Sequence, residues 1–79
     1  MDSRTNKLAP GTKVVLKSIP PGLLDNLPAR DKHAIAAIVG KPVTLVEYDD
    51  LDRAELEFTD KSGIVHYIYV KPVFIRPAD

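Results

Sequence analysis

The acidic side chains of the chain are concentrated between residues 47 and 60, and they include Glu47, Asp49, Asp50, Asp52, Glu55, Glu57 and Asp60. Carboxylate oxygens are the ligands that Ca²⁺ and Mg²⁺ prefer, and Asp49, Asp50 and Asp52 fall on one turn. The run lacks the fixed alternation, the turn glycine and the terminal bidentate Glu of a calcium-binding loop. We therefore predict no metal site here. The run is interpreted as a solvated hairpin tip, which, if it acts at all, docks a basic partner.

Two histidines, His33 and His66, are the only imidazoles. A metal site or a proton-transfer pair would need them close together beside an open coordination position or a substrate cleft. His66 shares strand parity with Ile64 and Ile68, which favours a core imidazole hydrogen-bonded to backbone. His33 is predicted on the exposed surface of a helix.

No arrangement of nucleophiles resembles a catalytic site. Ser3, Ser18 and Ser62 fall in a tail, a strand end and a hairpin, with no elbow or triad pattern around them. The glycines stand singly, so there is no phosphate loop. The absence of cysteine excludes disulfides, thiolate catalysis and thiolate metal sites. We predict no catalytic residue, no cofactor and no enzymatic activity.

Tyr67 and Tyr69 are the best candidates for a contact surface, because they share one strand face with Val65. Tyrosine combines a large apolar ring with a polar tip and is enriched in interface hot spots. The alternative is that a helix packs across this face and turns it into a second small core. Both interpretations stay open on the sequence. The predicted partner surface consists of Tyr48, Tyr67, Tyr69, Leu23 and Leu24.

Net charge is zero over the 79 residues, but its distribution is uneven. Residues 1–41 hold seven Lys or Arg against three acids, and residues 42–79 hold four against eight, which gives +4 and −4. Zero net charge argues against a sequence-independent grip on nucleic acid. A nucleic-acid or ribosome-associated function would require basic residues to converge on one face, and the candidates are Lys13, Lys17, Arg30, Lys32 and Lys41.

The length predicts a single domain over residues 11–79, preceded by a flexible polar tail at residues 1–10. The start of the chain has no apolar region of the signal-peptide kind, and no stretch approaches the length of a spanning helix. A soluble cytoplasmic protein without membrane contact is expected.

Five short strands are predicted, at residues 13–19, 42–48, 53–59, 64–70 and 74–76. In the second, Val43 and Leu45 share one face whereas Val46 and Tyr48 fall on the other by parity. Either a bulge or burial of both faces would explain this. The third alternates cleanly, with Ala54, Leu56 and Phe58 inward.

The segment between the first two strands is a long insertion. Its loop, residues 20–28, carries three leucines that must find cover against the domain. Pro28 suits the first helical position and Gly40 the C′ position, so a helix is predicted between them. Ala34, Ile35, Ile38 and Val39 form a one-sided apolar stripe. A helix this short must dock against the sheet.

One strand, a long elaborated loop, three meandering strands and a proline-marked kink before a final short strand make the order of an SH3-like barrel. The stretches that carry the likeness are GTKVVLKSI, GKPVTLVEY, RAELEFTDKSG, IVHYIYVKP and FI. The chain resembles small bacterial SH3-like barrel proteins of uncharacterised function, and more distantly barrels that serve as accessory subunits of electron-transfer complexes or as ribosomal and transcription modules.

The resemblance implies a mainly β fold, a five-stranded SH3-like barrel with a helix inserted between strands 1 and 2. The chain has no Trp and puts leucines and a helix where peptide-binding SH3 domains place aromatic side chains, so recognition of PxxP peptides is not carried over. We expect a non-catalytic protein–protein interaction or accessory-subunit module, with a nucleic-acid-binding barrel as the alternative.

Overall fold

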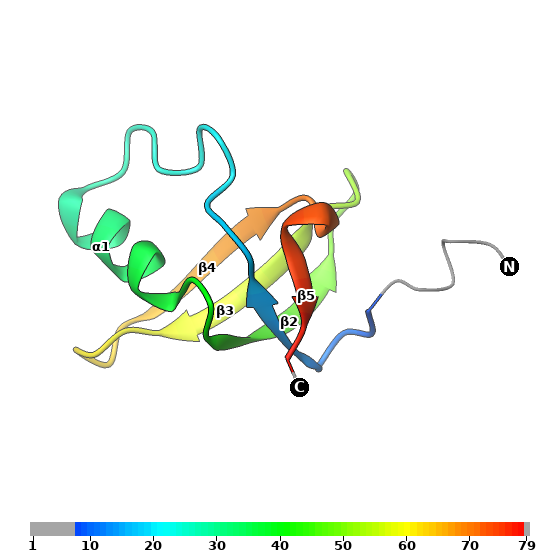
Figure 1. Cartoon of the computed structure of the whole chain (residues 1–79). Helices are drawn as coiled ribbons and strands as arrows, with labels where there is room; N and C mark the ends of the chain where they lie inside the picture. Colours follow the sequence, from blue (N-terminus) through cyan, green and yellow to red (C-terminus); the bar gives the residue numbers. More distant parts are fainter. Residues whose placement is uncertain (1–7, 79) are drawn as a thin grey trace, which may run out of the picture.

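A five-stranded antiparallel sheet and one α-helix make up the described part of the chain, residues 8–78 of a computed structural model (Figure 1). The predicted order of strands, with a helix between the first and second, is confirmed. The elements are β1 (Lys13–Leu16), α1 (Ala29–Ile38), β2 (Pro42–Tyr48), β3 (Ala54–Thr59), β4 (Val65–Val70), the short 3₁₀ helix η2 (Pro72–Phe74) and β5 (Ile75–Pro77).

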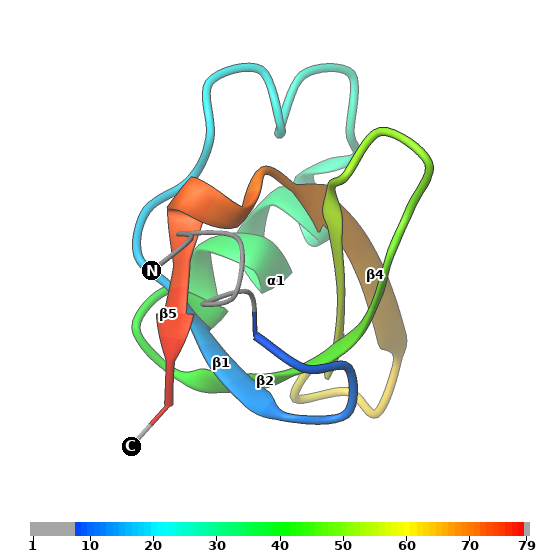
Figure 2. The same ribbon diagram turned by 90° about the vertical axis from the view of Figure 1, so that its right-hand side faces the viewer.

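The sheet runs in the order β4-β3-β2-β1-β5 and is open. It curls, so that β4 and β5 stand on opposite sides of the molecule (Figure 2). Within residues 8–78 no ladder joins these two edges, so the predicted closure into a barrel is not observed. β5 pairs with β1 along one edge, and its three residues offer little length for a second ladder on the other.

A β-bulge explains the broken alternation of β2. The register with β3 shifts between Leu45 and Glu47, which leaves Val46 as the extra residue. Beyond the bulge Glu47 lies opposite Glu55, and Tyr48 lies opposite Ala54, on the buried face. Of the two explanations predicted for this strand, the bulge is the one observed.

The core lies on the concave face of the sheet, where side chains from all five strands meet. The largest fully buried side chains are Val14, Leu16, Leu45, Leu56, Val70 and, from α1, Ile35. Ile35 is 2% exposed, so the predicted docking of the helix is confirmed. Burying an isoleucine of this kind contributes roughly 2–3 kcal/mol and holds α1 against the sheet.

The insertion lies against this core, as its leucines predict. Leu23, Leu24 and Leu27 are half-buried and pack on the core cluster. Pro28 stands one residue before α1, and Gly40 ends the helical segment with φ of +83°. This left-handed conformation is the one that glycine adopts without strain, which is why the chain can turn sharply into β2.

Three strands are shorter than predicted, although β3, which begins at Ala54, loses only one residue. β1 ends at Leu16 rather than residue 19, and beyond it the Lys17 amide donates to the carbonyl of Phe74. β4 begins at Val65, and Ile64, expected to face inward, is 41% exposed. The Ile64 amide donates instead to the Asp60 carboxylate, which draws this residue into the hairpin turn.

Packing begins slightly before the predicted domain boundary. Residues 1–7 of the predicted tail lie outside the described residues. Leu8 is half-buried against the core, and its carbonyl accepts a hydrogen bond from the Tyr48 hydroxyl at 2.8 Å. None of the helices in residues 8–78 has the length and apolar character needed to cross a membrane.

Candidate functional site

The five predicted surface residues divide into two groups. Tyr67 and Tyr69 are 54% and 42% exposed, and they stand with Val65, which is 46% exposed. The helix therefore does not cover this face, which answers the question the sequence left open. We call Val65, Tyr67 and Tyr69 the tyrosine stripe.

The other predicted surface residues serve the interior. Tyr48 is half-buried on the concave face, with its hydroxyl bonded to Leu8. Leu23 and Leu24 are half-buried against the core. These three side chains pack on the core, and Leu23 also lines a hollow at the surface, whereas the tyrosine stripe faces solvent.

Carboxylates lie beside the tyrosine stripe on the convex face. Across the β3–β4 ladder Glu57 is opposite Tyr67 and Glu55 is opposite Tyr69. The negative charge of Glu55, then partial desolvation and the charges of Asp49 and Glu47, raise the pKa of the Tyr69 hydroxyl. The stripe is therefore apolar in its rings and sits in a negative field.

Within residues 8–78 no strand pairs with the outer edge of β4, to which the three residues of the tyrosine stripe belong. The Asp60 amide donates to the Ile64 carbonyl. This bond shows which residue pairs of the β3–β4 ladder are hydrogen-bonded and which are not. Bonding alternates along an antiparallel pair, so His66, Ile68 and Val70 bond to β3. The N–H and C=O groups of the tyrosine stripe consequently point away from β3, toward the open edge.

A hollow of about 320 Å³ follows this edge. Its walls come from the insertion and from both faces of β4, and the lining residues are Leu23, Leu27, Asp31, Ile35, Arg53, His66, Tyr67, Ile68 and Tyr69. Because residues of both strand faces line it, the hollow must lie along the strand edge itself. We call it the β4 trough.

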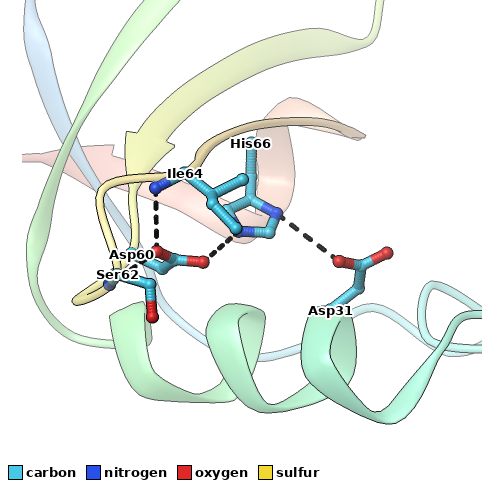
Figure 3. A network of polar contacts seen from close by, with 5 residues as sticks. All are labelled: Asp31, Asp60, Ser62, Ile64 and His66. Atoms are coloured by element: carbon cyan, nitrogen blue, oxygen red, sulfur yellow. Dashed lines mark hydrogen bonds and ion pairs between the residues drawn. The ribbon is translucent and has the colours of Figure 1, made fainter.

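His66 lines the trough, and its ring lies between the carboxylates of Asp60 and Asp31 (Figure 3). Its Nε2 lies 2.8 Å from Asp60 Oδ2, and its Nδ1 lies 3.8 Å from Asp31 Oδ1 on α1. The imidazole is 11% exposed and stacks on the Phe58 ring at 5.1 Å. The inward orientation was predicted, but the expected backbone partner is wrong, since carboxylates flank the ring.

Asp60 is held as a carboxylate by three donors. The hydrogen bond from His66, then those from the Ile64 and Ser62 amides, hold the pKa of Asp60 below its usual value of 3.8. An ionised carboxylate only accepts hydrogen bonds, so Nε2 of His66 carries the proton. The hairpin turn and the ring are thereby joined, while the Asp31 carboxylate on α1 lies beyond hydrogen-bond distance of Nδ1.

The predicted acidic hairpin tip is organised by Asp49. Its carboxylate accepts hydrogen bonds from the Leu51 and Arg53 amides and from the Arg53 guanidinium, with Nη2 at 2.7 Å. Partial desolvation acts to raise the pKa of Asp49, but these bonds outweigh it and lower the pKa. Arg53 also lies over the Tyr69 ring at 5.3 Å. Within residues 8–78 no three His, Asp or Glu side chains gather as metal ligands would.

A second groove, of about 810 Å³, lies between α1 and the β3–β4 hairpin. Three of the five cations predicted for a nucleic-acid face line it, namely Lys13, Arg30 and Lys41, joined by His33 and Lys61. Lys17 and Lys32 are not among its lining residues. His33 is exposed, as predicted. We call this the basic groove.

From the sequence we did not predict the contacts of Asp31 and Asp60 with His66 or the left-handed backbone of Asn26. Asp60 carried a signal, because an Asp at the start of a D-K-S-G hairpin turn is placed to accept amides two and four residues later. Asn26 has φ of +65°, a conformation for which Asn is favoured. The sequence gives no signal for the contact of Asp31 with His66, since that contact depends on where α1 docks.

Comparison of the chain with protein-family profiles, curated proteins and solved structures finds no match.

Proposed function

We propose that this chain is a non-catalytic protein-interaction module of the SH3-like class, which uses the tyrosine stripe as its contact surface. The observation that carries the proposal is the exposure of three apolar side chains in a row on an edge strand. Aromatic side chains held rigidly by a sheet lose little entropy on binding and are frequent hot spots. An accessory subunit would use such a surface to join a larger assembly.

The SH3-like assignment is supported by the order of the elements. β1, a long insertion, the β2–β3–β4 meander, a proline-marked turn at η2 and the return of β5 to β1 follow the order on which the resemblance rests. The open sheet departs from a closed barrel, and fold alone would not indicate what is bound. The binding proposal therefore rests on the tyrosine stripe.

Selection from a displayed library of random linear peptides on the immobilised protein tests the proposal. We expect enriched peptides whose binding weakens at least about tenfold in a Tyr67→Thr/Tyr69→Thr variant, since hot-spot truncation costs about 2 kcal/mol or more. Threonine keeps the β propensity of the strand while it removes both rings.

A matched control removes two exposed apolar side chains elsewhere. Leu51 and Val73 are 72% and 67% exposed, so Leu51→Thr/Val73→Thr should leave binding unchanged. If no peptide is enriched, or if both double variants bind equally, the tyrosine stripe is not the contact surface.

The basic groove supports a second candidate, the binding of single-stranded nucleic acid. Lys13, Arg30, Lys41 and Lys61 outnumber the carboxylates among the lining residues, Glu57 and Asp60, although the chain has no net charge. Each phosphate neutralised on a single strand contributes about 0.7 to the salt slope. A slope of about −2 to −3 in log Kobs against log[salt] is therefore expected if three or four cations act.

Fluorescence anisotropy of a labelled twelve-nucleotide oligothymidylate at low and moderate salt measures this slope. Lys13→Ala/Lys41→Ala should weaken binding and flatten the slope, whereas Lys17→Ala/Lys32→Ala, outside the groove, should not. No binding at low salt, or the same loss in both double variants, would remove this candidate.

A further inference from the structure

We infer that the partner segment docks as an extended strand paired to the edge of β4, with apolar side chains facing the β4 trough and Lys or Arg side chains facing the tyrosine stripe. This inference rests on the proposed function and specifies the chemistry of the partner.

The two edges of the sheet are not equivalent. β5 is three residues long, carries Arg76 and ends at Pro77, which cannot donate to a ladder. β4 has six residues, none of which is Asp, Glu, Lys, Arg or Pro. Natural edge strands are usually protected by charge, proline or shortness. β5 has these protections and β4 lacks them, so β4 is the edge that can accept a strand.

The added strand is taken to be antiparallel, and backbone geometry then sets its register. The outward N–H and C=O groups belong to Val65, Tyr67 and Tyr69, so these residues would form the hydrogen-bonded pairs with the new strand. Side chains of the partner that lie opposite them point to the convex face. Those opposite His66 and Ile68 point to the concave side, into the β4 trough.

The trough determines the inward side chains. Leu23, Leu27 and Ile35 of the insertion and Ile68 of β4 give it an apolar wall, and His66 and Asp31 also line it. Its volume of about 320 Å³ is enough for aliphatic side chains from alternate positions of one strand. Pockets that receive alternate side chains provide the specificity in strand addition, while the backbone bonds provide affinity.

The charge around the tyrosine stripe determines which outward side chains the partner strand should carry. It also favours one kind of partner over a second copy of this chain. The tyrosine rings lie beside Glu55 and Glu57, and the raised pKa of Tyr69 reflects that negative field. Lys or Arg would pair with the field and lie over the rings, as Arg53 already lies over Tyr69. A second copy of β4 brings no cation, and it would bring a second set of carboxylates to the same face. A basic extended segment therefore fits better than self-association.

Capped nine-residue peptides provide the test. An alternating Val/Lys peptide should bind the protein at least about tenfold more tightly than a peptide of the same composition with its Val and Lys in two blocks. An alternating Val/Glu peptide should bind more weakly than both. Equal affinity of the alternating and block peptides would overturn strand addition.

N-methylation of the peptide isolates the backbone bonds. Methylating the amides of the lysines, which pair with the tyrosine stripe, should abolish binding. Methylating the valine amides, which point to solvent, should leave it within about threefold. On binding, exchange of the Val65, Tyr67 and Tyr69 amides should slow. If N-methylation at both sets has the same effect, the inference fails.

The two failures are distinguishable. Library peptides that depend on Tyr67 and Tyr69 but tolerate N-methylation at every position would uphold the proposed function and refute strand addition. Loss of dependence on the tyrosines would refute both. Protection of the stripe amides that rises with protein concentration in the absence of peptide would assign the edge to a second copy and overturn the inference.

Discussion

His66 ties β4 to the β3–β4 hairpin turn through one hydrogen bond of its imidazole. Its inward position follows from strand parity, so the sequence predicted it. Its partner did not follow, because Oδ2 of Asp60 reaches the ring only after Oδ1 has been fixed by the Ser62 and Ile64 amides. That Val65, Tyr67 and Tyr69 share one face was predictable, since it depends on alternation along one strand. Their exposure was not, since it depends on where α1 docks.

Asp60 should make stability depend on acid pH. A carboxylate whose folded pKa lies below its unfolded value stabilises the fold above the unfolded pKa, here about 3.8, and loses that contribution as the pH falls through the folded value. We expect Asp60→Asn to lower the melting temperature at pH 7 and to narrow the difference between pH 7 and pH 3.

Thermal unfolding of both proteins across this range is the measurement, with Asp25→Asn as the control. Asp25 is exposed, so the pH dependence of the control should match that of the parent. A parallel pH dependence in Asp60→Asn and the parent would contradict the assigned role of the His66–Asp60 bond.

At the scale of elements, α1 and the bulge in β2 show what local pattern can and cannot predict. The apolar stripe and Gly40 marked the helix to within a residue or two, because caps and periodicity are local. The bulge was one of two explanations for the same residues. Only the register against β3, which depends on the partner strand, selects between them.

Docking of α1 depends on Ile35. Ile35→Ala should destabilise the protein by about 2–5 kcal/mol, and Ile35→Val by about 0.5–1.5 kcal/mol. Urea unfolding measures both. A change below about 0.5 kcal/mol in the alanine variant would mean that the helix is not packed against the sheet, and amide exchange in residues 29–38 would then be fast.

The end of α1 depends on the backbone of Gly40. Its φ of +83° is unfavourable for residues with a Cβ, although nothing lies within 4 Å of where that atom would stand. Gly40→Ala should therefore cost about 1–2 kcal/mol through backbone strain alone. Gly40→Asn should cost less, because Asn tolerates this conformation. Equal stability of the parent and Gly40→Ala in urea unfolding would contradict this explanation.

For the whole molecule, the order of five strands and the inserted helix could be predicted, whereas the openness of the sheet could not. Closure depends on whether the two edges meet, and strand propensity says nothing about that. The curled sheet leaves β4 as an edge strand beside the β4 trough. This arrangement makes the tyrosine stripe a candidate docking site, although its sequence carries no recognition motif. The convergence of Lys13, Arg30 and Lys41 on one groove likewise depends on the fold.

Amide hydrogen exchange of the free protein, resolved by residue, tests the central claim that the edge of β4 is open. We predict slow exchange at His66, Ile68 and Val70, whose amides bond to β3, and fast exchange at Val65, Tyr67 and Tyr69 between them. Slow exchange at all six positions in dilute protein would show that the edge is already paired or covered, and it would contradict the proposed docking site.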